Sequence, residues 1–403
     1  MHIGIVIDTY DSGVNAGGVI STQRFVNLLR KAGHKVTIIT TGTEAPDKVI
    51  MPTYSIKVPY VIEILKRFKI TLAKPDDNKL NDILQELDII HIEFPFHLGK
   101  RAIELAKEKN IPVVSTFHVQ AENITYNLSL NNQKVIKTIY SYFINNIFNK
   151  SNFVISPSAF AKNELLHYGL KTETEVISNG VSEEFKYLNL KKDNNRFTIL
   201  TVGRLGKEKK QEIILQALAK SKFKDKIQLT IVGDGTCREN LIDMGKQFNI
   251  TPRFLRGIPI KELVHLYNTT DLYVHSGEVE LECMAVLEAI SCKLVPLIAN
   301  SEKSAAPQFA LDERSLFEKS NPEDLAKKID YWYSHPKELQ EISNKYLQES
   351  KKYNIKKSNE RIIAIYKRLI SENKKATIQP IQKKEISRLK TLKNYFKFGN
   401  KSE

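Results

Sequence analysis

The chain has 403 residues, of which 41% are hydrophobic and 27% are charged. This length predicts two domains, and the composition excludes a chain that is disordered throughout. The formal net charge is +15, from 61 Lys and Arg against 46 Asp and Glu, and it favours anionic partners such as phosphorylated ligands, nucleic acids or a membrane surface. Residues 374–403 hold nine basic and two acidic side chains, so this segment alone contributes +7.

Cysteine usage and the length of the apolar runs predict a cytoplasmic protein. Cys237, Cys283 and Cys292 are odd in number and match no zinc-ligand spacing, which indicates free thiols in a reducing compartment. The apolar run before Asp8 is too short for a signal peptide. The sequence has no uncharged run of about 18 or more apolar residues, so no membrane-spanning helix is predicted.

Short β-branched runs alternate with helical patterns along the chain. From the N-terminus, strands are expected at residues 2–8, 35–40, 88–94, 111–118, 152–158 and 174–181, with a helix over 19–34. A second series of strands is expected at 197–204, 227–235, 271–277 and 293–300, with helices over 210–220 and 322–335. Strands that are apolar on both faces and alternate with helices are typical of parallel sheets covered on both sides. The sequence therefore predicts an α/β protein with two doubly wound domains, joined near the polar segment 182–196.

Ligands of such sheets bind at the carboxyl ends of strands, so the segments that follow strands are candidate sites. In SGVNAGG (12–18), Gly17 and Gly18 lack Cβ atoms and would let amide groups approach an anion at a helix N-terminus, but a tight turn explains them equally well. In VGRLGKEKK (202–210), Arg204 and Lys209 follow a strand and could hold a diphosphate, with a solvated basic loop as the alternative.

The stretch SGEVELECMAVLEAI (276–290) is apolar yet carries four glutamates. A helix that begins near Glu282 would leave the amides around 283–285 available for phosphate oxygens. Glu280, on the preceding loop, is a candidate for sugar hydroxyls, and Glu288 for a ribose diol. Complementing the helix dipole explains Glu282 well, but it does not explain Glu288 inside the apolar AVLEAI.

His118 ends the expected strand in STFH (115–118), where an imidazole can hydrogen-bond a sugar, although a lone histidine is more often structural. All of these candidates lie at or just after the carboxyl end of a strand, and both domains contribute. Two such domains that face each other would place the candidates in one cleft.

The ordered set of motifs resembles the family 4 retaining glycosyltransferases. The matching segments are AGGV (16–19), SPSAFAKNEL (156–165), VISNGVSEEF (176–185), VGRLGKEKK (202–210), LTIVGDG (229–235) and the E-x7-E pair at 280 and 288. The stretches 279–290 and 299–317 further resemble the branch of that family that contains diacylglycerol glucosyltransferases.

The resemblance implies the GT-B fold, in which two Rossmann-like domains with parallel sheets face each other and a helical extension follows. It divides the chain into an acceptor domain (1–185), a nucleotide-sugar domain (196–355), a helix that packs back on the first domain (356–373) and a basic tail (374–403).

The resemblance also implies roles for the candidate residues. Arg204 and Lys209 match the basic pair on the donor diphosphate, and Glu288 matches the donor-ribose carboxylate. Glu280 and His118 match residues that contact the donor sugar. The family places the remaining candidates near the donor phosphates: the amides of Met284 and Ala285, and the loop glycines Gly17 and Gly18. Ser156 and Asn179 lie in matched motifs but have no assigned role.

Three positions depart from the family pattern. Glycine is usual where Cys283 and Lys210 stand, and an aromatic residue is usual where Glu282 stands. A side chain at Cys283 would make the approach of the donor tighter.

The resemblance implies a transfer that retains the anomeric configuration, with the acceptor hydroxyl attacking from the face that the diphosphate leaves. Basic side chains and a helix N-terminus would stabilise the charge that grows on the diphosphate. The chain contains no D-x-D motif, so we expect no metal ion on the diphosphate. No cofactor is expected either, and the resemblance implies UDP-glucose as the donor substrate.

Two segments suggest that the acceptor is a membrane lipid. The stretches 134–150 and 386–398 combine basic residues with aromatic or aliphatic ones at helical spacing, as in helices that lie on anionic membranes. A core-packed helix is the alternative for the first segment, and a disordered end is the alternative for the second. The expected location is therefore the cytoplasm, peripherally associated with the inner face of the membrane.

Other functions receive less support from the sequence. A nucleotide-dependent oxidoreductase would need a G-x-G-x-x-G motif with an acidic residue downstream, and a nucleic-acid-binding protein would need a recognisable motif; the chain has neither. A polysaccharide or protein acceptor stays open, as does a non-catalytic subunit that only binds a sugar nucleotide.

Overall fold

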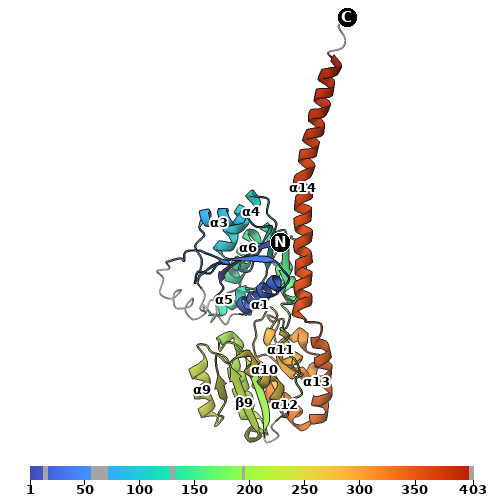
Figure 1. The fold of residues 1–403 in the computed structure, drawn as a ribbon. Coiled ribbons are helices and arrows are strands. Elements are labelled where there is room, and N and C mark those ends of the chain that lie inside the picture. The colour runs from blue at the N-terminus through green and yellow to red at the C-terminus, as the bar shows by residue number, and fades with distance from the viewer. Residues whose placement is uncertain (12–16, 56–70, 128–131, 193–195, 399–403) are drawn as a thin grey trace.

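The structure is a computed structural model that describes residues 1–11, 17–55, 71–127, 132–192 and 196–398, with side chains described up to residue 376. It has two lobes, one from each half of the chain, and a long C-terminal helix that runs along the first lobe and beyond it (Figure 1). The α/β architecture with two parallel sheets and a C-terminal helical extension is as the sequence predicts.

The first lobe contains a seven-stranded parallel sheet in the order β3-β2-β1-β4-β5-β6-β7. Its strands are β1 (His2–Thr9), β2 (Lys35–Thr41), β3 (Lys48–Ile50), β4 (Ile89–Ile92), β5 (Val113–Thr116), β6 (Phe153–Ser156) and β7 (Thr174–Val176). The buried residues of β1, β4, β5 and β6 have side chains on both faces, because helices cover both sides of the sheet.

The second lobe contains a six-stranded parallel sheet in the order β10-β9-β8-β11-β12-β13. Its strands are β8 (Phe197–Val202), β9 (Ile227–Val232), β10 (Arg253–Leu255), β11 (Leu272–His275), β12 (Val295–Asn300) and β13 (Leu316–Glu318). Every strand expected from the sequence is present. The sequence analysis missed β3, β10 and β13, which are three-residue edge strands whose runs are too short to show a hydropathy pattern.

The sheet of the first lobe separates two apolar cores, and helices cover the core on each face. These helices are α1 (Gly17–Lys31), α3 (Asp77–Leu84), α4 (His97–Glu108), α5 (Ala121–Asn127), α6 (Gln133–Asn146) and α7 (Ala159–His167), with the 3-10 turn η1 (Phe148–Lys150). One core contains α1, and the other contains α3, α4, α6 and α7. Local capping fixes some of their starts: Asp76 accepts from the amides of Asn78 and Lys79 at the start of α3, and Ser158 accepts from Ala161 at the start of α7.

Helices of the second lobe surround one continuous core. They are α8 (Gln211–Lys220), α9 (Arg238–Gln247), α10 (Ile260–Thr269), α11 (Met284–Ser291), α12 (Pro322–Ser334) and α13 (Pro336–Ser350), with the 3-10 turns η2 (Lys207–Lys209), η3 (Lys224–Lys226), η4 (Ala306–Phe309) and η5 (Glu313–Ser315). Pro322 at the first position of α12 follows Asn321, which caps the helix by accepting from Asp324.

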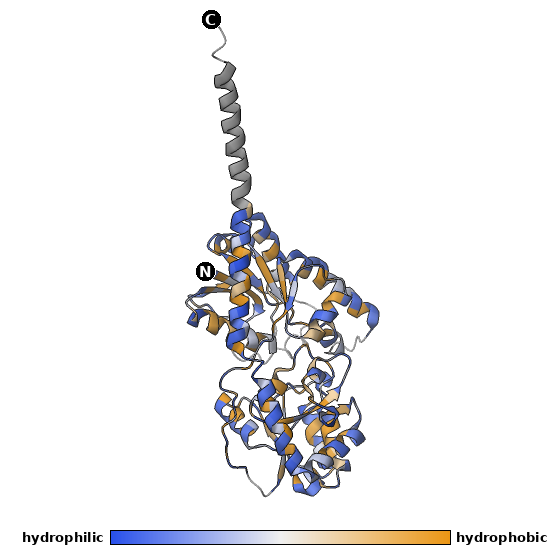
Figure 2. Cartoon of the chain, turned by 90° about the vertical axis from the view of Figure 1, so that its right-hand side faces the viewer, coloured by the Kyte–Doolittle hydropathy of each residue, from blue (hydrophilic) through white to orange (hydrophobic). Residues whose placement is uncertain are grey.

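The helix α14 (Ile355–Phe398) starts between the lobes and returns to the first one (Figures 1 and 2). Ile362, Ile365, Tyr366 and Leu369 pack into the same core as α1. The chain crosses between the lobes earlier, because Ile177 belongs to the first lobe's core whereas Val181 and Phe185 pack into the second. The first lobe is therefore built from both ends of the chain.

The structure does not favour membrane contact through the segment 134–150. This segment forms α6, whose apolar residues Ile136, Tyr140, Phe143 and Ile144 are buried in the core of the first lobe. Its helical spacing of apolar residues thus reflects packing against the sheet, which was the alternative interpretation of the sequence.

Candidate active site

The carboxyl edges of the two sheets face each other, and side chains connect the lobes across the gap. Ser158 Oγ donates to the carbonyl of Leu281 at 2.5 Å, and Gln120 Nε2 donates to the carbonyl of Lys303 at 3.0 Å. Loops that follow strands of both lobes therefore contact one another between the two sheets, as the sequence analysis expected from the topology.

On the second lobe, Lys209 and Glu280 form an ion pair. Lys209 ends the turn η2 after β8, and Glu280 lies in the loop between β11 and α11. His275, at the end of β11, places Nε2 3.4 Å from the same carboxylate. Burial opposes the negative charge, but the Lys209 ammonium holds the pKa of Glu280 below its usual value. The carboxylate is therefore ionised at neutral pH.

Lys209 and His275 respond to this environment in opposite directions. Burial works against the lysine charge, yet Glu280 and Glu208 raise the pKa of Lys209, so the ammonium persists. Burial lowers the pKa of His275 to about 4, which makes this imidazole neutral at pH 7. The backbone of Lys209 is fixed as well, because Ser276 Oγ donates to its carbonyl at 2.8 Å.

Arg204 follows β8 and lies beside a buried carboxylate of its own loop. Its guanidinium contacts Glu208 Oε1 at 2.5 Å, and the side chain of Glu208 is 0% exposed. Gln211 Nε2 donates to the carbonyl of Arg204 at 2.9 Å. These contacts hold the arginine at the carboxyl end of the sheet, with 28% of its side chain exposed.

The helix α11 begins at Met284, two residues later than expected. The amides of Met284 and Ala285 belong to the first turn, which lacks intrahelical acceptors. Cys283 precedes the helix with φ +77°, and Lys210 precedes α8 with φ +53°. Both are positions where the sequence departs from a usual glycine, and both keep the left-handed backbone that glycine adopts without strain.

The expected role of Glu282 as a helix-start residue that complements the dipole is wrong. Glu282 lies before α11 and its carboxylate accepts from the amide of Asn179 at 3.1 Å and from Asn179 Nδ2 at 2.6 Å. Asn179 in turn accepts from Ser21 Oγ at 2.7 Å. Burial raises the pKa of Glu282 to about 7 against these hydrogen bonds. The hydrogen bonds of Glu282 thus connect the second lobe to the segment between the lobes.

Glu288 lies inside α11 and is 7% exposed. Arg24 of α1 donates to its Oε1 at 3.1 Å, and the Tyr267 hydroxyl donates to its Oε2 at 3.4 Å. Burial raises the pKa of Glu288, and Arg24 opposes this effect. The structure thus brings a cation from the first lobe onto the carboxylate that the sequence analysis assigned to a ribose.

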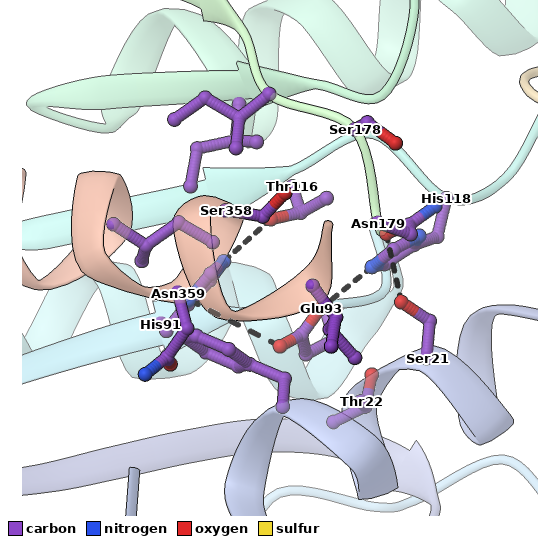
Figure 3. A pocket seen from close by; sticks show the side chains of 15 residues that line it. Ser21, Thr22, His91, Glu93, Thr116, His118, Ser178, Asn179, Ser358 and Asn359 are labelled. Atoms are coloured by element: carbon purple, nitrogen blue, oxygen red, sulfur yellow. Dashed lines mark hydrogen bonds and ion pairs between the residues drawn. The ribbon is translucent and has the colours of Figure 1, made fainter. Parts of the chain in front are cut away.

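On the first lobe, His118 follows β5 and its Nε2 lies 2.9 Å from Glu93 Oε2 (Figure 3). Gly18, at the start of α1, packs directly on this histidine: a Cβ there would lie 3.2 Å from His118 Cβ and 3.1 Å from the Phe94 ring. A Cβ at Gly17 would meet nothing within 4 Å. Close packing therefore explains Gly18, whereas Gly17 has no such requirement.

One group in the described residues offers metal ligands. His275, Glu280 and Cys283 place a nitrogen, an oxygen and a sulfur atom within 4.8 Å of one another. The Lys209 ammonium contacts the same carboxylate.

Comparison with known families matches nearly the whole of both lobes. The profile for glycosyltransferase family 4 matches residues 16–185, and the profile for glycosyl transferases group 1 matches residues 183–353. The chain belongs to the family 4 glycosyltransferases. This membership accords with the motif resemblance described above.

Relatives of this glycosyltransferase include two alpha-monoglucosyldiacylglycerol synthases. The one from Streptococcus pneumoniae is 27% identical over 74% of this chain and 71% of its own length, and the one from Acholeplasma laidlawii is 24% identical over 93% and 99%. The crystal structure of Anabaena HepE in complex with UDP matches with a TM-score of 0.71 at 14% identity, covering 91% of this chain and 99% of that one. Likeness at that identity shows the fold, which is GT-B.

The candidate site therefore has two walls, one from each lobe. Arg204, Lys209, Glu280 and the start of α11 lie together on the second lobe, and Gly18 and His118 lie together on the first. Sequence reasoning missed Glu93, Arg24 and His275. Glu93 does leave a signal, since it is a carboxylate at the end of an apolar strand run, but nothing in the local sequence marks Arg24 or pairs it with Glu288.

Other matched positions have structural partners. Ser156 Oγ lies 3.3 Å from Thr174 Oγ1 on the neighbouring strand, so this side chain connects β6 to β7. Among the helices of the glycosyltransferase that the structure describes, none combines the length and apolar character needed to span a membrane.

Proposed function

We propose that this glycosyltransferase moves glucose from UDP-glucose to a hydroxyl of a membrane lipid such as diacylglycerol, with retention of the anomeric configuration and without a metal ion. The observation that carries the proposal is the half-buried Lys209–Glu280 pair beside Arg204, at the carboxyl edge of the second sheet. An ionised carboxylate suits sugar hydroxyls and two cations suit a diphosphate, so this cluster has both halves of a sugar-nucleotide site.

The proposed roles follow from charge and position. Lys209, Arg204 and the first-turn amides of α11 stabilise the diphosphate, whose negative charge grows as it leaves. Glu280 and His118 hold the hexose, and Glu288 holds the ribose. Arg24 either moves away from Glu288 when the donor binds or contacts the nucleotide together with it. Cations of the protein take the role that a metal has in other transferases.

The proposed step balances without a co-reactant. The bond from the anomeric carbon to the phosphate oxygen breaks, and its electron pair stays on the diphosphate. The acceptor oxygen forms the new bond on the same face, and its proton passes to the departing phosphate oxygen. Stabilisation of the diphosphate therefore lowers the barrier for both events.

Support for glucose and for a lipid acceptor comes from the two relatives named as alpha-monoglucosyldiacylglycerol synthases. The basic composition of residues 374–403 adds to it, because lysines near an anionic bilayer each contribute about 1 kcal/mol of binding free energy. The helix α14 carries residues 374–398 away from both lobes (Figure 1).

A panel of donors and acceptors tests the proposal. The purified chain is incubated with UDP-glucose, UDP-galactose or GDP-mannose, and with diacylglycerol vesicles, a polysaccharide or no acceptor. We expect a glucosylated lipid by mass spectrometry, an α-anomeric proton by NMR, and unchanged turnover in EDTA. A glycosylated polysaccharide would replace the lipid acceptor, and the absence of transfer and hydrolysis with every donor would indicate a non-catalytic subunit.

Membrane binding has its own test. The full chain and a chain that ends at residue 376 are floated with vesicles of neutral lipid alone or with added anionic lipid. We expect the full chain to float with anionic vesicles only and the shortened chain to stay at the bottom. Equal flotation of both chains would remove residues 377–403 from the proposed membrane contact.

A further inference from the structure

Glu93 is a buried carboxylate that forms no ion pair with a lysine or arginine among the residues that the structure describes. Its side chain is 2% exposed, at the end of β4. His118 Nε2 lies 2.9 Å away and His91 Nδ1 lies 4.0 Å away. An isolated buried charge is costly, so these polar neighbours must compensate it.

Polar groups from four elements surround Glu93, and Figure 3 shows those from α1, β4 and the end of β5. The elements supply Thr22 from α1, His91 from β4, His118 from the end of β5, and Tyr366 from α14. Burial opposes the charge, but the hydrogen bond from His118 helps to lower the pKa of Glu93, so the carboxylate is ionised and can only accept hydrogen bonds.

His91 is held as a neutral ring. Burial lowers its pKa, and its two nitrogens contact the Tyr366 hydroxyl at 2.5 Å and Thr116 Oγ1 at 2.6 Å. His118 therefore provides the close N–H group that the Glu93 carboxylate accepts. Since a carboxylate accepts only from a protonated nitrogen, this contact fixes the proton of His118 on Nε2 and leaves Nδ1 for a different partner.

We infer that Glu93 is a positioning residue for the transfer reaction: it fixes the ring orientation and the Nε2-protonated form of His118, and α14 supports it through Tyr366 and His91. The inference rests on the proposed function in that His118 contacts the donor hexose. A histidine whose tautomer is set by a buried carboxylate presents a defined acceptor or donor to the sugar in every turnover.

The helix α14 also lines the pocket that contains Glu93 and His118. Ser358, Asn359 and Ile362 of α14 line the same small pocket as Glu93 and His118, and Asn359 is 6% exposed. The C-terminal helix thus completes the back of the catalytic wall of the first lobe. The helix that continues into the proposed membrane-binding segment therefore also packs behind the Glu93–His118 pair.

The decisive measurement is the tautomer of His118 in the full chain, which needs neither donor nor acceptor. Nitrogen-15 NMR of histidine-labelled protein distinguishes protonated from unprotonated ring nitrogens, and His118→Ala identifies the resonances. We expect His118 to be protonated on Nε2 in the parent protein and to populate both tautomers in Glu93→Gln, whose amide can also donate. A parent protein with His118 protonated on Nδ1 alone would overturn the inference.

Kinetics supply the second arm. Glu93→Gln is expected to lower kcat by about 10–100-fold with the donor KM unchanged, and Glu93→Asp is expected to recover part of the loss. The control is Glu122→Gln, because Glu122 is an equally buried carboxylate of this lobe that accepts from Tyr140 at 3.0 Å. It should leave both kcat and the His118 resonances unchanged.

Failure of the inference and failure of the proposed function give different results. If the parent protein transfers no hexose while the tautomer shifts as expected, the proposed function fails and the Glu93–His118 pairing stands. If transfer occurs and Glu93→Gln matches the parent in kcat, the inference fails. Should Glu93→Gln not fold, the tautomer of the parent protein and the kcat of Glu93→Asp decide the matter.

Discussion

The two walls of the site stabilise their buried carboxylates in different ways. On the second lobe, Glu280 and Glu208 contact the cations Lys209 and Arg204. On the first lobe, Glu93 lies among imidazoles and hydroxyls. The cationic wall suits a ligand that brings its own negative charge, whereas the neutral wall suits hydroxyls and needs fixed proton positions. Under the proposed function, the diphosphate is therefore expected on the second lobe, and the first lobe is expected to orient uncharged groups.

The largest expected effect comes from removing a cation of the second lobe. Lys209→Ala or Arg204→Ala should lower kcat by about 10²–10³-fold, because stabilisation of the departing diphosphate is lost where its charge develops. Steady-state transfer from UDP-glucose measures the change. Lys207→Ala is the matched control, since this lysine lies in the same turn with an exposed side chain and should retain parent activity. Parent-like kcat in both test variants would refute the assignment of the cationic wall.

The next effect concerns stability between the walls. Because the pKa of Glu282 is about 7 in the folded protein against about 4.5 for an exposed glutamate, the folded state holds this proton more tightly. The protonated Glu282 side chain therefore contributes fully to the free energy of unfolding below about pH 4.5, and this contribution is lost as the pH rises through 7. Glu282→Gln should therefore be more stable relative to the parent at pH 8 than at pH 5, by up to about 3 kcal/mol.

Urea unfolding of both proteins at the two pH values measures this difference. Asp8 is also buried with a pKa raised to about 7, so the parent protein has a second group of the same sign, and only the difference between variant and parent isolates Glu282. An equal difference at pH 5 and pH 8 would mean that Glu282 does not titrate in this range.

A smaller effect is expected at the carboxylate that joins the lobes. Glu288→Gln should raise the donor KM by about 10–100-fold with little change in kcat, because a hydrogen bond to a charged group contributes about 1.5–3 kcal/mol. Calorimetric titration with UDP gives the same quantity without turnover. Glu239→Gln on α9 is the exposed control. Unchanged UDP affinity in Glu288→Gln would separate this residue from the ribose.

The smallest effect is expected where side chains replace the usual glycines. Cys283→Gly and Lys210→Gly keep backbones with φ of +77° and +53°, and each should change the free energy of unfolding by no more than about 1 kcal/mol. Cys283→Ala should cost more than Cys283→Gly, because alanine retains the left-handed strain and also lacks the buried thiol. Thermal unfolding of the three variants ranks them, and a more stable alanine variant would contradict the argument.

Much of this arrangement was predictable because its causes are local. Runs such as 197–204 and 271–277 are apolar on both faces, and that property alone predicts buried parallel strands. The parallel topology then predicts that Arg204, Lys209 and Glu280 lie at one edge of a sheet, which the structure shows for the second lobe. Edge strands such as β10 escaped because three residues give no period.

Contacts between distant segments were not predictable, and they define the other half of the site. Arg24 reaches Glu288 across 264 positions, Asn179 reaches Glu282 across 103, and His91 reaches Tyr366 across 275. The sequence alone determined the two sheets, the family and the cationic loop, because hydropathy and motif spacing are properties of neighbouring residues. Only the tertiary structure decided which buried carboxylate meets which partner, because that depends on how two sheet edges and a returning helix come together.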